Sequence, residues 1–255
     1  MHVCARGFLF HTMISCNMYF TNKRPFTIMY VNGRLFRWGY MRIDIYYGGL
    51  GMIDTKERIL ITALKLFARD GYEAVSVRTI SEELGMTKGA LYRHYKNKRD
   101  IFDSIVNRMI EIDAQRAKEN KMPADKFETA PDTYRNTSIE SIKIYTIEQF
   151  RFWTEDEFAS QFRKMLTLEQ FHNAEMAKLY SQCISAGPVL YMADVFRELI
   201  GKGILKDQNP TQLAIEYYAP MFLLINMFDT AEENVDYVGI LISHINNFFQ
   251  HYATD

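Results

Sequence analysis

The chain has 255 residues, of which 48% are hydrophobic, and this is enough apolar surface for a folded core. Disorder of the whole chain is therefore excluded. The formal charge is −1, but the first 51 residues carry six Lys and Arg side chains against the single acid Asp44. The acidic remainder can still bind nucleic acid if its basic residues gather on one face, so the location of the charge matters more than the total.

Cysteine usage and hydropathy indicate a reducing compartment. The three cysteines form no C-x-x-C pair, no zinc spacing and no disulfide framework, so we expect a cytoplasmic protein without a metal or another cofactor. Residues 7–20 are fairly apolar, but His11 and Asn17 interrupt them and no small-residue cleavage site follows. We therefore expect neither secretion nor association with a membrane.

The sequence changes character at Met52. Residues 1–51 contain no Glu and show neither helical nor alternating periodicity, whereas capped helical sequence begins directly afterwards. We expect residues 1–51 to be a non-native or disordered upstream extension and Met52 to be the natural start. Peptide mass spectrometry of natively expressed protein checks this, because abundant peptides from residues 1–40 would contradict it. The alternative is a basic arm that adds nonspecific DNA affinity.

Four capping residues divide the next segment into helices. Asp54 begins the first helix, and Ser76 begins a short second one that ends before Gly85. Thr87 begins a third helix, which is expected to run to about Tyr95. Asn97 then begins a longer helix.

Two short helices joined by a glycine-containing turn predict a helix-turn-helix at about Val77 to Lys96, whose second helix enters the major groove. The segment from Gly85 to Arg99 holds five Lys and Arg residues and no acid. Taken singly, each of these residues could equally be an ordinary surface residue. Together with the helix N-terminus at Thr87, which offers unpaired N–H groups to phosphate, they favour DNA binding.

This stretch resembles the DNA-binding domain of the TetR family of transcriptional regulators. The resemblance is carried by Gly71-Tyr72, Ser76-Val77-Arg78-Thr79-Ile80, Leu84-Gly85-Met86-Thr87-Lys88-Gly89-Ala90-Leu91-Tyr92-Arg93-His94-Tyr95 and Lys96-Asn97-Lys98. Ala90 and Arg93 depart from the residues frequent in the family, which leaves the operator sequence open. With the cap at Thr87 included, the DNA-contacting residues are expected to be Ser76, Arg78, Thr87, Lys88, Gly89, Ala90, Tyr92, His94 and Lys98.

The rest of the chain predicts an all-α fold, since no strand signal is found. The expected domains are 52–99 for DNA binding, with a linking helix that continues to about 114–120, and 121–255 for effector binding and dimerisation. Helical periodicity and the boundaries Gly187-Pro188 and Asn209-Pro210 predict helices at about 98–120, 139–153, 156–170, 173–185, 188–202, 210–228 and 234–252.

The last two helices are unusually apolar. The resemblance implies that they pair with their counterparts in a homodimer, although an apolar stripe alone cannot distinguish an interface from an ordinary core. The residues expected at the interface are Met221, Leu224, Ile225, Phe228, Leu241, Ile245, Phe248 and Phe249.

The resemblance also places an effector pocket in the middle helices. Aromatic and Met side chains suit flat or apolar ligands, but the same side chains could be plain core. His172, Glu169 and Glu175 are not expected to bind a metal, because such groups on a surface helix are more often solvated. The expected lining residues are Phe150, Trp153, Phe158, Phe162, Met165, Phe171, Met176 and Tyr180.

The predicted function is a ligand-responsive repressor. Its expected partners are double-stranded operator DNA, a second copy of the chain and a small-molecule effector whose binding releases the DNA. The chain has no G-x-S-x-G, P-loop, G-x-G-x-x-G or H-E-x-x-H motif, so we expect no enzyme. The alternative is a helical interaction module whose helix-turn-helix contacts a protein.

Overall fold

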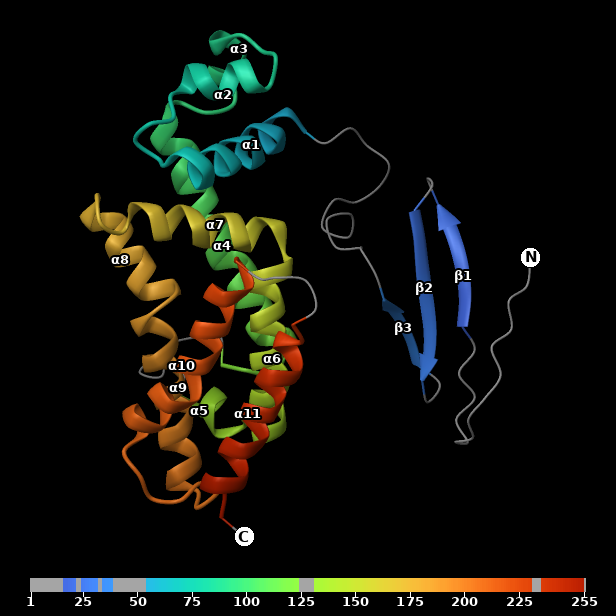
Figure 1. Cartoon of the computed structure of the whole chain (residues 1–255). Helices are drawn as coiled ribbons and strands as arrows, with labels where there is room; N and C mark the ends of the chain where they lie inside the picture. The colour runs from blue at the N-terminus through green and yellow to red at the C-terminus, as the bar shows by residue number, and fades with distance from the viewer. Residues whose placement is uncertain are drawn as a thin grey trace. The chain divides into compact units, whose positions relative to one another are not determined.

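The computed structural model describes residues 16–21, 24–31, 34–38, 54–123, 131–230 and 235–254 (Figure 1). The chain divides into two compact units, Met1–Ile53 and Asp54–Asp255. In the second unit the described regular elements are helices, apart from a β-bridge between Leu205 and Ala253. This confirms the prediction of an all-α fold for the part of the chain that follows Met52.

The first unit contains a three-stranded antiparallel sheet in the order β1-β2-β3. Its strands are β1 (Cys16–Thr21), β2 (Arg24–Val31) and β3 (Arg34–Trp38), with Thr21 paired to Arg24 and Val31 to Arg34. These segments of the expected upstream extension therefore form regular strands, and its non-native origin stays a prediction. Their sequences are rich in aromatic and β-branched residues, and Asn32-Gly33 is a strong hairpin signal that was overlooked. The start at Met52 stays a prediction.

Short helices open the second unit, each begun by the expected cap. They are α1 (Thr55–Asp70), α2 (Val77–Glu83) and α3 (Lys88–Tyr92). The Ser76 hydroxyl accepts from Thr79 N at 3.1 Å, and the Thr87 hydroxyl accepts from Ala90 N at 3.2 Å. These bonds satisfy N–H groups that the first turn of a helix leaves unpaired, which fixes where α2 and α3 begin.

One long helix, α4 (Lys98–Glu119), leads from this group into the rest of the unit (Figure 1). A later helix, α7 (Glu157–Glu169), crosses beneath α1 and packs against it. Across this contact the Lys65 ammonium lies 2.7 Å from the Glu157 carboxylate. The helices that follow α4 agree with the predicted ranges, except that α5 was not expected: α5 (Pro131–Arg135), α6 (Ile139–Glu155), α7 (Glu157–Glu169), α8 (Ala174–Cys183), α9 (Ala186–Gly201), α10 (Pro210–Phe228) and α11 (Tyr237–Tyr252).

Among the described residues, no helix is both long and apolar enough to cross a membrane.

A continuous core joins the elements of the second unit. Phe67, Ile80, Leu91 and Phe102 hold α1–α4 together, and each is at most 1% exposed. Burial of such side chains stabilises a fold by roughly 1.5–3 kcal/mol each relative to exposure.

Candidate nucleic-acid interface and interior cavity

The turn between α2 and α3 is set by Gly85, which has a φ of +65°. This left-handed conformation is readily adopted only by glycine, and it lets Met86 N donate to Ser81 O at 2.9 Å. The chain thus reverses within a few residues and starts again at Thr87. The arrangement of α2 and α3 is that of a helix-turn-helix, as predicted.

The exposed side of α3 carries most of the predicted contact residues. Lys88, Gly89 and Tyr92 are exposed, with Tyr92 at 50%, whereas Leu91 is fully buried beneath them. Ala90 and His94 are half-buried on the same helix or directly after it, and Arg93 and Lys96 add exposed positive charge. Those two cations were left out of the predicted contact set, although the absence of acids after Gly85 was the signal for them.

The remaining predicted contacts lie at the start of α2 and α4. Ser76 and Arg78 are exposed, and the Arg78 guanidinium lies 2.6 Å from the Glu82 carboxylate on the outer side of α2. Lys98 differs, because its ammonium donates to Tyr72 O at 2.8 Å and sits 4.1 Å from the centre of the Tyr72 ring. The ammonium of Lys98 is thus held partly within the protein, and its contact with phosphate stays a prediction because a lysine has further N–H donors.

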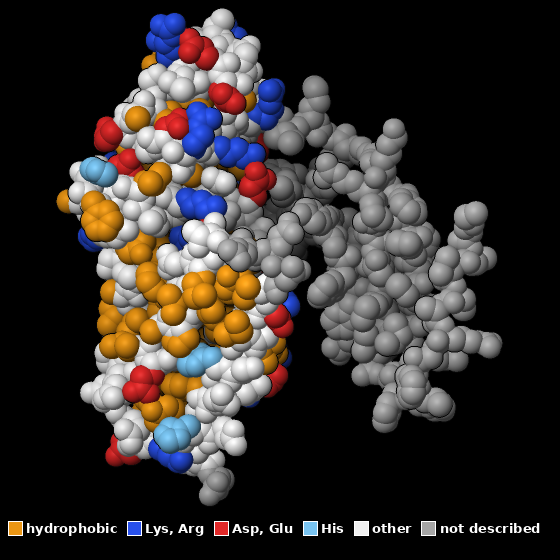
Figure 2. All heavy atoms as spheres, viewed as in Figure 1, with side chains coloured by type: hydrophobic (Ala, Val, Ile, Leu, Met, Phe, Trp, Pro, Cys, Tyr) orange, Lys and Arg blue, Asp and Glu red, His pale blue; other side chains and the backbone are white. Residues whose placement is uncertain are grey.

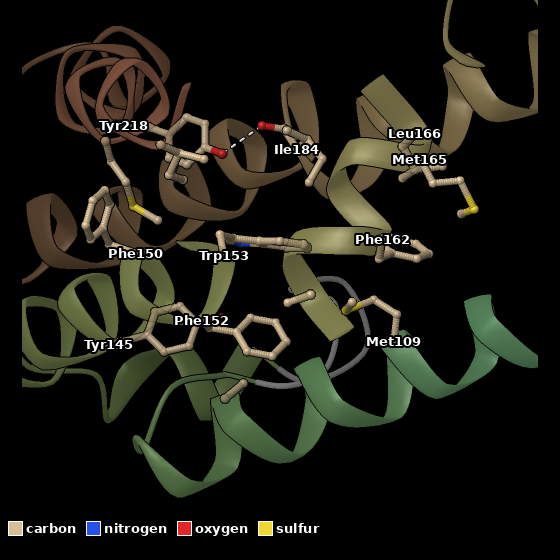
Figure 3. Packing of buried hydrophobic residues seen from close by; sticks show 14 of the residues in the cluster. Met109, Tyr145, Phe150, Phe152, Trp153, Phe162, Met165, Leu166, Ile184 and Tyr218 are labelled. Carbon is tan, nitrogen blue, oxygen red and sulfur yellow. Dashed lines mark hydrogen bonds between the residues drawn. The ribbon is translucent and has the colours of Figure 1, made fainter. Parts of the chain in front are cut away.

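Below the helix-turn-helix the structure encloses a cavity of about 700 Å³. Helices α4, α6, α8, α9 and α10 supply most of its wall, which carries aromatic, apolar and polar side chains together with two acids, Asp113 and Asp194. Figure 3 shows Tyr145, Trp153 and Met109 among the packed residues of this region. The wall consists of Met109, Ile110, Asp113, Ala114, Ala117, Pro123, Tyr134, Tyr145, Thr146, Gln149, Trp153, Gln182, Cys183, Gly187, Pro188, Leu190, Tyr191, Met192, Asp194, Tyr217, Tyr218 and Met221.

The predicted pocket residues need correction, because Trp153 alone among them lies on the wall of this cavity. Core packing takes up Phe150, Phe162, Met165 and Met176, which are at most 1% exposed. The other three are Phe158, which packs on the Arg108 guanidinium, the half-buried Tyr180, and Phe171, which is 84% exposed after α7. The predicted set omits Tyr191 of α9 and Tyr217 and Tyr218 of α10, which line the cavity. The α10 residues are absent from it because the resemblance assigns that helix to an interface.

Polar groups on the wall form hydrogen bonds with one another in two places. Gln149 Nε2 donates to Asp113 Oδ1 at 3.1 Å and to the Tyr145 hydroxyl at 2.6 Å, while the Thr146 and Tyr217 hydroxyls lie 2.8 Å apart. Asp113 is exposed by accessible area and lines the cavity, while protein atoms surround its carboxyl group. This desolvation raises the pKa of the Asp113 carboxyl, although the Gln149 hydrogen bond and the charge of Arg116 act in the opposite direction.

Similar burial affects two other cavity groups. It raises the pKa of the Cys183 thiol to about 11, so this cysteine is an unreactive thiol at neutral pH. The Tyr218 hydroxyl, whose pKa burial also raises, donates to Ile184 O at 2.7 Å (Figure 3).

Among the described residues, no cluster of three His, Cys, Asp or Glu could hold a metal ion.

The predicted dimer residues of α10 and α11 also need correction. Phe228 is half-buried and the other seven are at most 6% exposed inside one copy of the chain, so these seven cannot touch a partner. The exposed side of α10 instead carries Ile215, Ala219, Leu223 and Met227 at a spacing of four residues. This spacing places them in one row along the helix, called here the α10 stripe. Figure 2 shows a broad hydrophobic patch on the face where α10 and α11 run.

Two contacts join residues that flank the helix-turn-helix to the ends of α7 and α8. The Glu169 carboxylate at the end of α7 accepts from Tyr72 N at 2.8 Å, and its other oxygen is buried without a partner. The Arg99 guanidinium donates to both carboxylate oxygens of Glu175 at 2.6 and 2.5 Å. The helix α4, which begins directly after the helix-turn-helix, also forms part of the cavity wall.

Known proteins resemble this chain most strongly over the helix-turn-helix. The sequence model for bacterial regulatory proteins of the tetR family matches residues 59–105. The HTH-type transcriptional regulator YerO of Bacillus subtilis is 45% identical over 47 residues, which cover 18% of this chain and 16% of YerO. The HTH-type regulator AcrR of Shigella flexneri is 40% identical over 52 residues, which cover 20% of this chain and 24% of AcrR.

Solved structures extend the likeness to the whole helical unit. SmeT, the repressor of the Stenotrophomonas maltophilia multidrug efflux pump SmeDEF, is 21% identical with a TM-score of 0.56, over 79% of this chain and 92% of SmeT. Its complex with triclosan has a TM-score of 0.58. At this identity the likeness shows a shared fold. Residues 59–105 thus match the sequence model of the tetR family of bacterial regulatory proteins, and the helical unit shares the fold of SmeT.

Proposed function

We propose that this chain is a homodimeric transcriptional repressor that binds operator DNA through α3 and releases it when a small molecule occupies the cavity. The observation that carries the proposal is the exposed, basic α3 presented by a helix-turn-helix. AcrR and SmeT are named as a regulator and a repressor, which supports the same role here. The match of residues 59–105 to a family of regulatory proteins supports the expectation that the chain is not an enzyme.

The proposed contacts with DNA divide into two kinds. Lys88 and the N-terminus of α3 at Thr87 are placed to bind phosphate, which sets affinity and salt dependence. Tyr92, with half of its surface exposed on the same helix, is placed to reach base edges or the backbone. Ala90 and Gly89 allow close approach of the α3 backbone.

A second copy of the chain is proposed to pack on the α10 stripe. A symmetric dimer presents two copies of α3 to two half-sites, which a helix-turn-helix protein needs for a long enough operator. Burial of the stripe would cover Leu223 and Met227, which are 59% and 44% exposed in one copy. Release of DNA then requires that the ligand stabilise a conformation in which the spacing of the two recognition helices does not fit the operator. The coupling free energy between ligand binding and DNA binding is about 1–3 kcal/mol in such systems.

Fluorescence anisotropy with the DNA upstream of the gene and a shuffled control tests DNA binding. Lys88→Ala should weaken binding to both DNAs and lower the slope of log affinity against log salt by about one. Tyr92→Ala should weaken binding to the specific DNA by about tenfold and change the shuffled control less. The matched control is Lys178→Ala, which removes an exposed lysine from α8 and should leave both affinities unchanged.

Two outcomes would contradict the proposal. Wild-type affinity in both the Lys88 and the Tyr92 variants would show that α3 is not the recognition helix. Equally weak binding of both DNAs that does not vary with salt would favour the alternative, a helix-turn-helix that contacts a protein.

A further inference from the structure

The wall of the cavity carries negative side chains and no positive one. Among the described residues that line it, Asp113 and Asp194 are acids, and there is no Lys, Arg or His. Asp194 is paired with the Arg197 guanidinium on its own helix. The Asp113 carboxylate has no ion pair within the described part of the chain, and it accepts a hydrogen bond of 3.1 Å from the uncharged Gln149. The cavity therefore holds a carboxylate that the protein does not neutralise by direct contact.

The nearest basic side chain is directed elsewhere. The charge of Arg116 acts on Asp113, but its guanidinium donates to Glu148 O at 2.7 Å and lies 4.1 Å from the centre of the Phe152 ring. It is not part of the cavity wall. Because the protein supplies no closer cation, burial outweighs the stabilising contacts and raises the pKa of the Asp113 carboxyl.

A second acceptor lies next to this carboxylate. Gln149 is 9% exposed, and its amide nitrogen is used by Asp113 and Tyr145, while its Oε1 is buried with no hydrogen-bond partner. An acceptor without a partner favours a ligand that brings a donor. A carboxylate and an amide oxygen side by side suit a group that has both a positive charge and an N–H.

Aromatic rings surround the same space. The Tyr191 ring lies 6.4 Å from the ring of Tyr145 and 6.1 Å from that of Tyr134, measured between centroids, and Trp153 completes this part of the wall. The faces of Tyr and Trp rings attract cations, and their area accommodates an apolar body. A volume of about 700 Å³ is within the range of small-molecule sites.

We propose that the cavity binds a lipophilic amine in its protonated form, with the ammonium group between Asp113 and Gln149 and the apolar body against Tyr145, Tyr191 and Trp153. This inference rests on the proposed role of the cavity as the effector site, and it assigns the chemical class of the effector. The ammonium supplies the charge that Asp113 lacks, and a small shift of the buried Gln149 amide would let it also donate to Gln149 Oε1.

Isothermal titration calorimetry with the full chain tests the proposal with four compounds that share one apolar body. They are 4,4-diphenylbutylamine, its N,N,N-trimethyl derivative, 4,4-diphenylbutan-1-ol and 4,4-diphenylbutanoate. The amine should bind about tenfold to hundredfold more tightly than the alcohol, because hydrogen bonds to charged groups are stronger than neutral ones. The trimethyl compound should fall between them, since it keeps the charge but cannot donate to Gln149 Oε1. The carboxylate should bind most weakly.

Paired variants assign the effect to Asp113. Asp113→Asn should lower the affinity for the amine to within about threefold of that for the alcohol, and unchanged binding of the alcohol shows that the variant is folded. The matched control is Glu111→Gln, which removes an exposed carboxylate from the same helix, outside the cavity wall, and should change neither affinity.

Each other result would overturn the proposal. Equal binding of amine and alcohol would show that charge is not recognised. Tighter binding of 4,4-diphenylbutanoate would show that Arg116, whose Nε is buried without a partner, sets the charge of the ligand. Absence of binding by all four compounds at about 1 mM would exclude this class of ligand. None of these results needs DNA, so the proposed repressor role stands or fails separately in the anisotropy experiment.

Discussion

Leu223→Glu is expected to leave the protein monomeric and to abolish tight binding to a two-half-site operator. Leu223 lies within the α10 stripe and is 59% exposed in one copy of the chain. An isologous interface contains the residue twice, so the substitution places two carboxylates in it. Burial of an unpaired polar group costs about 1–3 kcal/mol, and a charged group costs more. The dissociation constant of the dimer should therefore rise by about 100-fold or more.

Sedimentation velocity over a range of protein concentrations measures this change. The matched control is Phe171→Glu, which places the same acid at an apolar side chain that is 84% exposed and lies outside α10 and α11. It should remain a dimer with wild-type DNA affinity. A dimeric Leu223 variant, or equal dissociation of the Phe171 variant, would show that the α10 stripe is not the interface.

Asp229→Ala is expected to give the largest loss of stability of any single change considered. The Arg163 side chain is 4% exposed, and its guanidinium donates to the two carboxylate oxygens of Asp229 at 2.6 and 2.9 Å. Its remaining bonds, to Trp153 O, are long at 3.4 Å. Removal of the carboxylate leaves a buried cation without its counterion, which should lower the free energy of unfolding by about 3–5 kcal/mol.

Chemical denaturation of three variants separates this effect from a general loss of contacts. The double variant Arg163→Met with Asp229→Ala should be more stable than Asp229→Ala alone, because the uncompensated charge is gone. The control is Asp132→Ala, which breaks an exposed pair with Arg135 and should cost less than about 1 kcal/mol. If the double variant were no more stable than Asp229→Ala, the buried charge would not be the cause.

The same ion pair predicts a dependence on pH. Partial burial alone raises the pKa of Asp229, but the hydrogen bonds and charges of Arg163 and Lys164 outweigh it and lower the pKa below the ordinary 3.8. A carboxyl whose pKa is lower in the folded state stabilises the fold above its unfolded pKa and loses this contribution as the pH falls through the folded value. The stability difference between wild type and Asp229→Ala should thus be constant near neutral pH and shrink below about pH 4.

Local sequence signals predicted the helices of the second unit well. Ser76, Thr87 and Asn97 cap α2, α3 and α4 as expected, since a cap depends on atoms within three residues of itself. Gly85 likewise marks the turn because only its own φ is involved. In residues 16–38 the same kind of local signal, Asn32-Gly33, was present but was not used.

The roles of the apolar and charged side chains could not be predicted in the same way. Helical periodicity shows that Phe162, Ile245 and Phe248 lie on apolar faces, but it does not show what covers each face. The structure puts all three in the core, and it leaves Leu223 on the surface. The sequence predicts Lys98 only as a phosphate ligand. The structure adds that its ammonium donates to the backbone carbonyl of Tyr72, which is 26 residues away.

The helix-turn-helix, its caps and the positive charge on and directly after α3 could be predicted from the sequence, because these features depend on neighbours along the chain. Only the tertiary structure decided that a cavity lies among α4, α6, α8, α9 and α10, that Asp113 and Gln149 meet in it, and that the α10 stripe is the uncovered face. Those features depend on packing between segments far apart in the sequence, and apolar patterning specifies such packing only as a face, without naming its partner.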